Sequence, residues 1–163
     1  MITYVSYQPH YHSAVQKLGE ETFDSTYAHE FRAALRDADP ESIVVLHKRQ
    51  VVGFALLAKA RLFRHLDCTE LAYLVVHPDF QGHGIGSTLL QKVKMMSPNV
   101  ILEVSYYNPD AERLYRRHGF EHWRHLGNKT NGGYLMGYSS ERHERMLRLR
   151  SREHPPADGT AAR

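Results

Sequence analysis

The chain has 163 residues, of which 42% are apolar and 24% charged. That length supplies one sizeable hydrophobic core and is too short for two ordinary domains. Lys and Arg number 21 and Asp and Glu 18, and so small a positive excess neither requires nor excludes a nucleic-acid partner. The single cysteine, Cys68, cannot form an internal disulfide, and no stretch has the apolar length of a signal peptide or a membrane-spanning helix. We therefore expect one soluble, cytoplasmic domain with no membrane partner.

The spacing of apolar residues predicts alternating strands and helices along most of the chain. In chain order, the expected elements are a strand at 2–7, one or two helices at 11–37 with a break near 22–27, a hairpin of 43–46 and 51–57 around residues 47–50, a strand at 70–76, a helix from 85 to 96, a strand at 100–104, a helix from 109 to 118, and a final strand pair of 120–126 and 134–138. In the helix from 85 to 96, one apolar face contains Ile85, Leu89, Val93 and Met96. This order predicts an α/β (α+β) fold, with a mixed, mostly antiparallel sheet of six to seven strands flanked by about four helices.

The composition changes at about residue 140. Residues 140–163 contain six Arg and four acidic residues, whereas residues 1–139 carry 15 basic and 14 acidic residues. Most of the positive excess therefore lies in this last segment, for which we expect an Arg-rich terminal helix followed by a disordered tail. Alternatively, the segment contacts a partner or an anionic surface. This Arg-rich segment is also the one feature that would support a nucleic-acid-binding function. Such a function predicts salt-dependent binding that disappears when residues 140–163 are deleted.

A glycine-rich turn between Val75 and Gly86 (VVHPDFQGHGIG) is the strongest local signal. Where a strand leads through such a turn into a helix, the first helical amides have no intrahelical acceptor and can together hold a phosphate. A dinucleotide-binding fingerprint beginning at Gly82 would need glycine at position 87, where the chain has Ser87, and the lysine of a Walker loop is absent. The turn therefore predicts a phosphate-binding loop of another kind, with a plain strand-to-helix turn as the alternative.

A second signal follows one strand later, at residues 102–120. There Asn108 can cap a helix that begins at Pro109 and that Gly119 ends. Together, the two stretches resemble the signature of the GCN5-related N-acetyltransferase (GNAT) superfamily. The matching residues are Gln81, Gly84, Gly86, Asn108, Leu114, Tyr115, Gly119 and Phe120.

The resemblance implies that residues 1–139 form an N-acetyltransferase domain. It further implies a V-shaped opening between the strand that ends near Val76 and the strand that begins near Val100. Acetyl-CoA would be the cosubstrate, with its pantetheine arm in that opening and its pyrophosphate at the amides of residues 81–86. The residues that the resemblance assigns to coenzyme binding are Leu74, Val75, Val76, Gln81, Gly82, His83, Gly84, Ile85, Gly86, Ser87, Asn108 and Tyr115.

The same resemblance implies three catalytic candidates. Glu70 lies eleven residues before Gln81, where the family often has a glutamate base, and Glu103 lies where some peptide-terminal acetyltransferases have theirs. Either carboxylate could take a proton from the amine directly or through water, and Glu70 ranks first because of its spacing to the glycine turn. For each glutamate, the alternative is an ordinary strand-end charge or ion-pair partner. Tyr115 would be the general acid that protonates the leaving thiolate, with simple core packing as its alternative.

No metal is expected. His122 and His125 form an isolated pair in a predicted strand, where side chains three residues apart face opposite sides of the sheet. Such a pair makes a poor metal site.

The function that these observations favour is transfer of an acetyl group from acetyl-CoA to a primary amine, by direct attack through a tetrahedral intermediate. The alternative is a non-catalytic module that binds acyl-CoA as a sensor or an interaction surface. The acceptor would be a small amine or a peptide amine. The family resemblance implies that it contacts the segments Glu21–Phe31, Arg61–Asp67 and Asn128–Tyr134, which show no dominant charge. Nucleic acid is not favoured as a partner, and a homodimer is left open.

Overall fold

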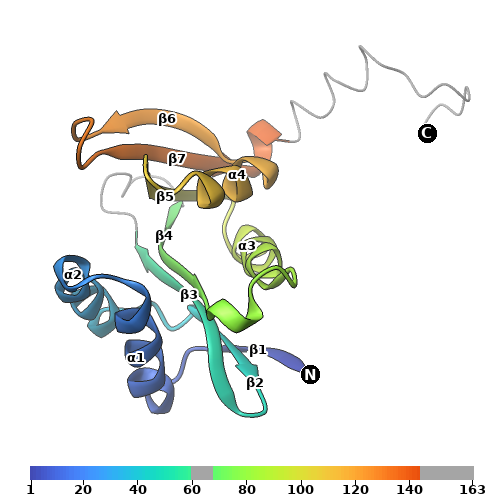
Figure 1. The fold of residues 1–163 in the computed structure, drawn as a ribbon. Helices are drawn as coiled ribbons and strands as arrows, with labels where there is room; N and C mark the ends of the chain where they lie inside the picture. The colour runs from blue at the N-terminus through green and yellow to red at the C-terminus, as the bar shows by residue number, and fades with distance from the viewer. Residues whose placement is uncertain (60–67, 144–163) are drawn as a thin grey trace, which may run out of the picture.

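The computed structural model describes residues 1–59 and 68–143. Within them the chain forms seven strands, four α-helices and two 3-10 turns (Figure 1). In chain order these are β1 (Ile2–Ser6), η1 (Pro9–Tyr11), α1 (His12–Thr22), α2 (Ser25–Arg36), β2 (Ile43–His47), β3 (Gln50–Lys59), β4 (Cys68–Val76), η2 (Pro78–Phe80), α3 (Ile85–Met96), β5 (Asn99–Ser105), α4 (Pro109–Arg117), β6 (Glu121–Leu126) and β7 (Gly133–Ser139). The segment Arg61–Asp67 and residues 144–163 of the predicted tail lie outside the described residues.

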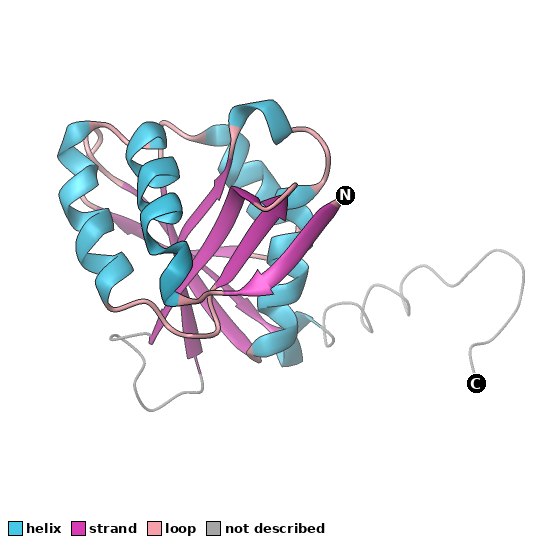
Figure 2. Ribbon diagram, turned by 90° about the horizontal axis from the view of Figure 1, so that it is seen from below, coloured by secondary structure: helices cyan, strands magenta, loops and turns pink. Residues whose placement is uncertain are grey.

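The strands form a single sheet in the order β1-β2-β3-β4-β5-β7-β6. Every neighbouring pair is antiparallel except β4 and β5, which are parallel. The strands fan out between the helices on their two faces (Figure 2). The predicted element order and the mixed, mostly antiparallel sheet are therefore confirmed.

Each face of the sheet has its own core. On one face α1 and α2 pack against β2, β3 and β4, and the Phe31 ring stacks on Phe54 with centroids 5.7 Å apart. On the other face α3 and α4 pack against alternate residues of the strands. Alternation of side chains along each strand supplies both cores, because successive residues point to opposite faces. No helix among the described residues has the length and apolar character needed to cross a membrane.

Three local predictions need correction. Met96 does not join the buried face of α3: it is the last helical residue and is 41% exposed, whereas Leu90 is fully buried. The break expected near 22–27 is shorter, since α1 ends at Thr22 and α2 begins at Ser25. Of residues 47–50, only Lys48 and Arg49 form the turn of the hairpin, both with positive φ (46° and 66°). A two-residue turn with both φ values positive matches the twist of the flanking strands, so β2 and β3 continue up to it.

The two histidines of β6 were expected on opposite faces, and this prediction is wrong. The register between β6 and β7 shifts between His122 and Arg124, which leaves Trp123 as an extra residue. His122 and His125 consequently both contact the ring of Tyr134, at centroid distances of 4.0 and 5.1 Å. A β-bulge of this kind reverses the alternation downstream of it. The described residues contain no group of three or more His, Cys, Asp or Glu side chains that could hold a metal ion.

Candidate active site

The parallel contact between β4 and β5 is short. It consists of three residue pairs, of which the last joins Glu70 to Ile101. Beyond that pair β4 continues to Val76 and β5 continues to Ser105 without pairing to each other. The two strands therefore open into the V-shaped space that the family resemblance implied.

A cavity of about 500 Å³ lies at this opening, on the face of the sheet covered by α3 and α4. Its floor is the end of β4, and its walls are the glycine-rich loop, the first turn of α3 and one side of α4. Nine of the predicted coenzyme-binding residues line it: Leu74, Val76, Gln81, Gly82, Gly84, Ile85, Gly86, Ser87 and Tyr115. The lining residues that sequence reasoning missed are Phe80, Asp110, Ala111, Leu114 and Arg117.

The glycine-rich loop offers free backbone donors to this cavity. Gly82 and Gly84 have φ values of +77° and +80°, and a Cβ at either position would meet no atom within 4 Å. In the part of the chain that the structure describes, the amides of residues 82–87 donate no backbone hydrogen bond, and the first to do so is Thr88, to the Gly84 carbonyl at 3.0 Å. Unpaired amides at a helix start attract anions, because they point into one volume and the helix dipole adds positive potential. The loop fits a pyrophosphate without any basic side chain.

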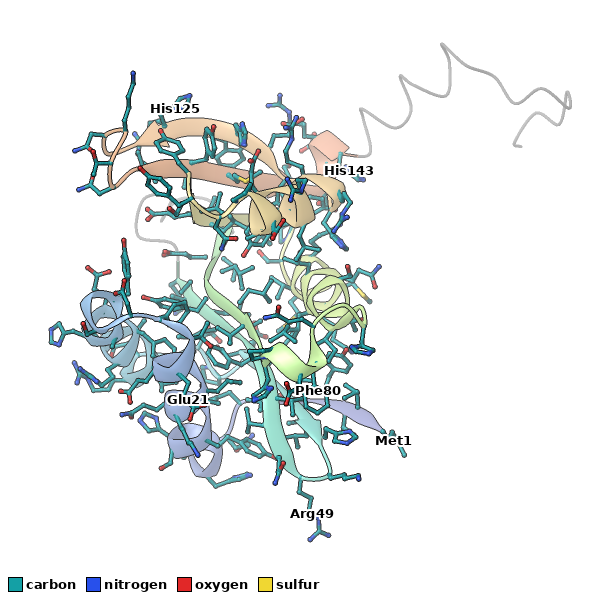
Figure 3. All side chains as sticks on the ribbon, in the orientation of Figure 1. Met1, Glu21, Arg49, Phe80, His125 and His143 are labelled. Atoms are coloured by element: carbon teal, nitrogen blue, oxygen red, sulfur yellow. The ribbon has the colours of Figure 1, made fainter. Side chains whose placement is uncertain are left out.

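Side chains of the loop hold it against the strand ends. The Gln81 side-chain amide donates to the Val76 carbonyl at 2.9 Å, and His77 Nδ1 accepts from the Asp79 amide at 3.2 Å. Phe80, labelled in Figure 3, has its ring between those of His47 and His77, with centroid distances of 5.2 and 5.9 Å. These contacts fix the direction in which the loop presents its amides.

Three predicted coenzyme-binding residues do not line the cavity with their side chains. The Val75 side chain is buried on the opposite face, in the core of α1 and α2, so only its backbone faces the opening. The His83 ring turns back, with Nδ1 2.9 Å from the Gln81 carbonyl oxygen. Asn108 caps α4, where its Oδ1 accepts from the Ala111 amide at 3.2 Å. The expected cap is present, and a coenzyme contact by Asn108 stays a prediction.

Tyr115 brings a buried phenol to the cavity. It lies on α4 beside Phe120, is only 8% exposed, and burial raises the pKa of its hydroxyl to about 12. A phenol with so high a pKa stays protonated throughout the neutral range. Tyr115 can therefore act as a hydrogen-bond or proton donor to an anion that forms in the cavity.

The two candidate bases lie on the other face of the sheet. Glu103 follows Leu102, whose side chain is in the α3 and α4 core, and so it points the opposite way. Glu70 pairs with Ile101, which faces the same side as Glu103 and packs with Leu135. The structure therefore brings Glu70 and Glu103 to one face of the opening, while the glycine-rich loop and Tyr115 occupy the other.

Two further residues near this face are Tyr73, which sequence reasoning missed, and Glu30, which lies within the predicted acceptor segment Glu21–Phe31. Burial raises the pKa of Tyr73, and the negative charges of Glu30, Glu70 and Glu103 raise it further, so these carboxylates lie near the phenol. A β-bulge at Ala72, where the register between β3 and β4 shifts, places Tyr73 on the same face as Glu70 although they are three residues apart. No sequence signal marks the bulge, because it depends on the pairing with β3.

Comparison with known proteins agrees with this geometry. A sequence profile of the acetyltransferase (GNAT) family matches residues 7–120. The chain belongs to the acetyltransferase (GNAT) family. The resemblance carried by its two motifs is thereby confirmed, and the family is one of acyltransferase enzymes.

The chain is also similar to individual proteins. It is 30% identical over 98 residues to the peptidyl-lysine N-acetyltransferase YjaB of Escherichia coli, a match that covers 58% of this chain. The matched region is 60% of the length of YjaB. Among solved structures, a GNAT-family acetyltransferase of Desulfovibrio desulfuricans superposes with a TM-score of 0.72 at 16% identity, covering 86% of this chain and 99% of the other. Arabidopsis thaliana NAA60 in complex with acetyl-CoA superposes with a TM-score of 0.69 at 17% identity. The match covers 85% of this chain and 99% of the NAA60 chain.

Proposed function

We propose that this acetyltransferase transfers the acetyl group of acetyl-CoA to a primary amine, and that a peptidyl lysine is the acceptor. The observation that carries the proposal is the division of the β4–β5 opening into two sides. The face covered by α3 and α4 holds an anion-binding loop and a protonated phenol, whereas the opposite face holds carboxylates. Donor and acceptor would thus enter from opposite faces and react where the strands part.

The donor side suits acetyl-CoA. The free amides of residues 82–87 would hold its pyrophosphate, and the unpaired edges of β4 and β5 would lie along its pantetheine arm. A solved relative of the same fold, NAA60, binds acetyl-CoA. Neither interaction requires a basic side chain, in agreement with the near neutrality of residues 1–139.

The acceptor side suits a cationic amine. A lysine amine is almost wholly protonated at neutral pH, because its reference pKa is about 10.4, and it must lose that proton before it attacks the thioester. Glu30, Glu70 and Glu103 would attract the ammonium form, and Glu70, closest to the point where the strands part, would accept the proton directly or through water. YjaB, which shares 30% identity over the matched region, is a peptidyl-lysine N-acetyltransferase.

Collapse of the tetrahedral intermediate then expels the coenzyme A thiolate. Tyr115 would donate its proton to that sulfur, since it lines the donor cavity and its hydroxyl remains protonated. The amine nitrogen forms the new C–N bond and the C–S bond breaks. Of the two protons that the ammonium group loses, one leaves through Glu70 to solvent, and the other balances the proton that the thiol gains.

A direct assay tests the proposal. The protein is incubated with acetyl-CoA and a panel of lysine peptides, polyamines and amino acids, and product is measured both as free thiol and as acetylated acceptor by mass spectrometry. We expect turnover on lysine peptides, a strong loss of kcat in Tyr115→Phe with coenzyme binding retained, and normal activity in the matched control Tyr4→Phe, on the edge strand β1. Tight acetyl-CoA binding without turnover on any amine would instead support the non-catalytic sensor.

A further inference from the structure

One row of side chains crosses β5, β7 and β6 on the face of the sheet that Glu70 and Glu103 share, here called the acceptor face. Glu103 of β5 pairs with Leu135 of β7, and Leu135 pairs with Arg124 of β6. Directly opposed residues of neighbouring strands project to the same face of a sheet. The row therefore carries a carboxylate at one end, an apolar side chain in the middle and a guanidinium at the other end.

The bulge in β6 is what places Arg124 on this face. His122, before the bulge, turns to the α4 side, where its Nε2 lies 2.9 Å from a carboxylate oxygen of that helix. Plain alternation from His122 would turn Arg124 to the same side. Trp123 is instead the extra residue, with its ring on the bare backbone of Gly137, and the pairing of Arg124 with Leu135 follows it.

The two charged ends of the row are exposed and have no counter-ion. Leu135 between them is only 4% exposed. Neither Glu103 nor Arg124 forms an ion pair with any residue that the structure describes, whereas Glu121 of the same strand pairs with Arg142 at 3.0 Å. The described core beneath α1 and α2 takes its residues from β1 to β4, and Figure 1 shows β6 and β7 at the other end of the sheet. Neither helix therefore packs on the row.

The acceptor face thus has charges of opposite sign on its two sides. At the opening, the negative charges of Glu30, Glu70 and Glu103 all act on the phenol of Tyr73. Arg124 lies two strands beyond Glu103, about 9–10 Å away at the backbone, because neighbouring strands are about 4.7–4.9 Å apart. A purely cationic acceptor would be attracted to the first side and repelled by the second. An acceptor that carries both an amine and a carboxylate would meet the opposite charge at each.

We propose that Arg124 selects peptides in which an acidic residue lies two positions from the acetylated lysine. The inference rests on the proposed function and names the peptides that its acceptor side would take. In an extended peptide, residues two apart project to the same side and are about 6.6 Å apart along the chain. A peptide laid across the row can therefore turn its lysine towards the opening and its carboxylate towards Arg124, whose guanidinium would hold it by charge-assisted hydrogen bonds. Polyamines and lysines flanked by basic residues are disfavoured by the same charge.

Peptide kinetics test this selection. Peptides with a single lysine carry Glu, Gln or Arg two residues before it in one set and two residues after it in another, and kcat and KM are measured for the full-length protein at constant ionic strength. In one set, the Glu peptide should exceed the Gln peptide in kcat/KM by about fivefold, the upper range for an exposed ion pair, and the Arg peptide should be poorest. The difference should lie in KM, because Arg124 is remote from the reacting atoms.

Charge substitutions assign the effect to one residue. Arg124→Gln should remove the preference for Glu without changing the KM of the Gln peptide, and Arg124→Glu should reverse it in favour of the Arg peptide. Both variants should keep the Kd for acetyl-CoA, since the donor cavity is on the other face. Arg49→Glu makes the same change in net charge in the exposed β2–β3 turn, which Figure 3 labels far from His125 of β6, and should keep the original order.

The outcomes separate this inference from the function on which it rests. Equal turnover of the three peptides, or a preference for Glu that survives in Arg124→Gln, would overturn the role of Arg124 and leave lysine acetylation standing. Turnover of none of the peptides would overturn the proposed function, and the selection with it.

Discussion

Glu70 stands opposite Ile101 in the last residue pair of the parallel ladder between β4 and β5. Its side chain therefore lies at the apex of the opening, on the face that Glu103 shares. We expect Glu70→Gln to lower kcat by about 100-fold or more, because a positioned base contributes about that factor. Its Kd for acetyl-CoA should stay unchanged, since the donor cavity is on the other face. Steady-state kinetics and a coenzyme titration measure the two effects.

Glu103→Gln is the matched comparison. Glu103 lies on β5 two residues beyond Ile101, the partner of Glu70 in the parallel ladder, and is therefore further from the apex of the opening. Its loss should mainly raise the KM for a lysine peptide, because the attraction of the ammonium group is weakened. A larger loss of kcat in Glu103→Gln than in Glu70→Gln would make Glu103 the base. Thermal unfolding of both variants checks that neither effect reflects loss of the fold.

Burial of Tyr115 predicts a distinctive dependence of stability on pH. The folded state binds the phenolic proton more tightly than the unfolded chain, since its pKa is raised from 10.0 to about 12. Its contribution to stability is therefore complete below pH 10 and is lost as the pH rises through 12. Between pH 9 and pH 11 the protein should lose about 1.4 kcal/mol more unfolding free energy than Tyr115→Phe, as measured by urea denaturation. Equal losses in both proteins would contradict the burial of an ionisable phenol at this position.

Gly84→Ala tests the phosphate loop. Gly84 has a φ of +80° at the start of α3, and an alanine there would cost about 1–2 kcal/mol of stability and add a methyl group to the anion cradle. We expect the Kd for acetyl-CoA, measured by calorimetry, to rise by about tenfold or more. Gly127→Ala, at φ +64° in the β6–β7 turn, imposes a similar backbone strain away from the loop, together with a close contact of the new Cβ to Gly132 Cα at 3.0 Å, and should keep normal affinity. If both variants lose coenzyme affinity equally, the effect is one of stability.

The cap and the coenzyme contact of Asn108 can be separated. Asn108→Ala should lose about 1 kcal/mol, because the Ala111 amide loses its acceptor, whereas Asn108→Ser keeps a capping oxygen. If the Asn108 amide group also contacts acetyl-CoA, both variants should bind the coenzyme more weakly, while only the alanine variant unfolds earlier. Normal coenzyme affinity in Asn108→Ser would limit the role of Asn108 to the cap.

Local signals in the sequence were sufficient to predict the loop and helices that surround the donor cavity. The glycine turn, the cap at Asn108 and the apolar period of α3 each depend on residues close in sequence, so the phosphate loop and the position of Tyr115 could be predicted. The same holds for the order of strands and helices.

The acceptor side could not be predicted in the same way. Tyr73 and Glu30 come from different elements, and they approach Glu70 and Glu103 only after α2 has packed on the sheet. The bulges at Ala72 and Trp123 depend on the partner strands β3 and β7, and simple alternation assigns the residues beyond them to the wrong face.

The extra residue in β4 has a consequence for how this site could change. Ala72 carries no reactive group, yet it is the extra residue at which β4 bends between its two halves: Leu74 and Val76 floor the donor cavity, and Glu70 faces the acceptor. Deleting Ala72 would join Leu71 directly to Tyr73 and restore plain alternation against Leu57 and Leu56, so Glu70 would keep its face. A one-codon deletion could thus remove the local bend of β4 at the opening while every ionisable residue of the site keeps its side of the sheet.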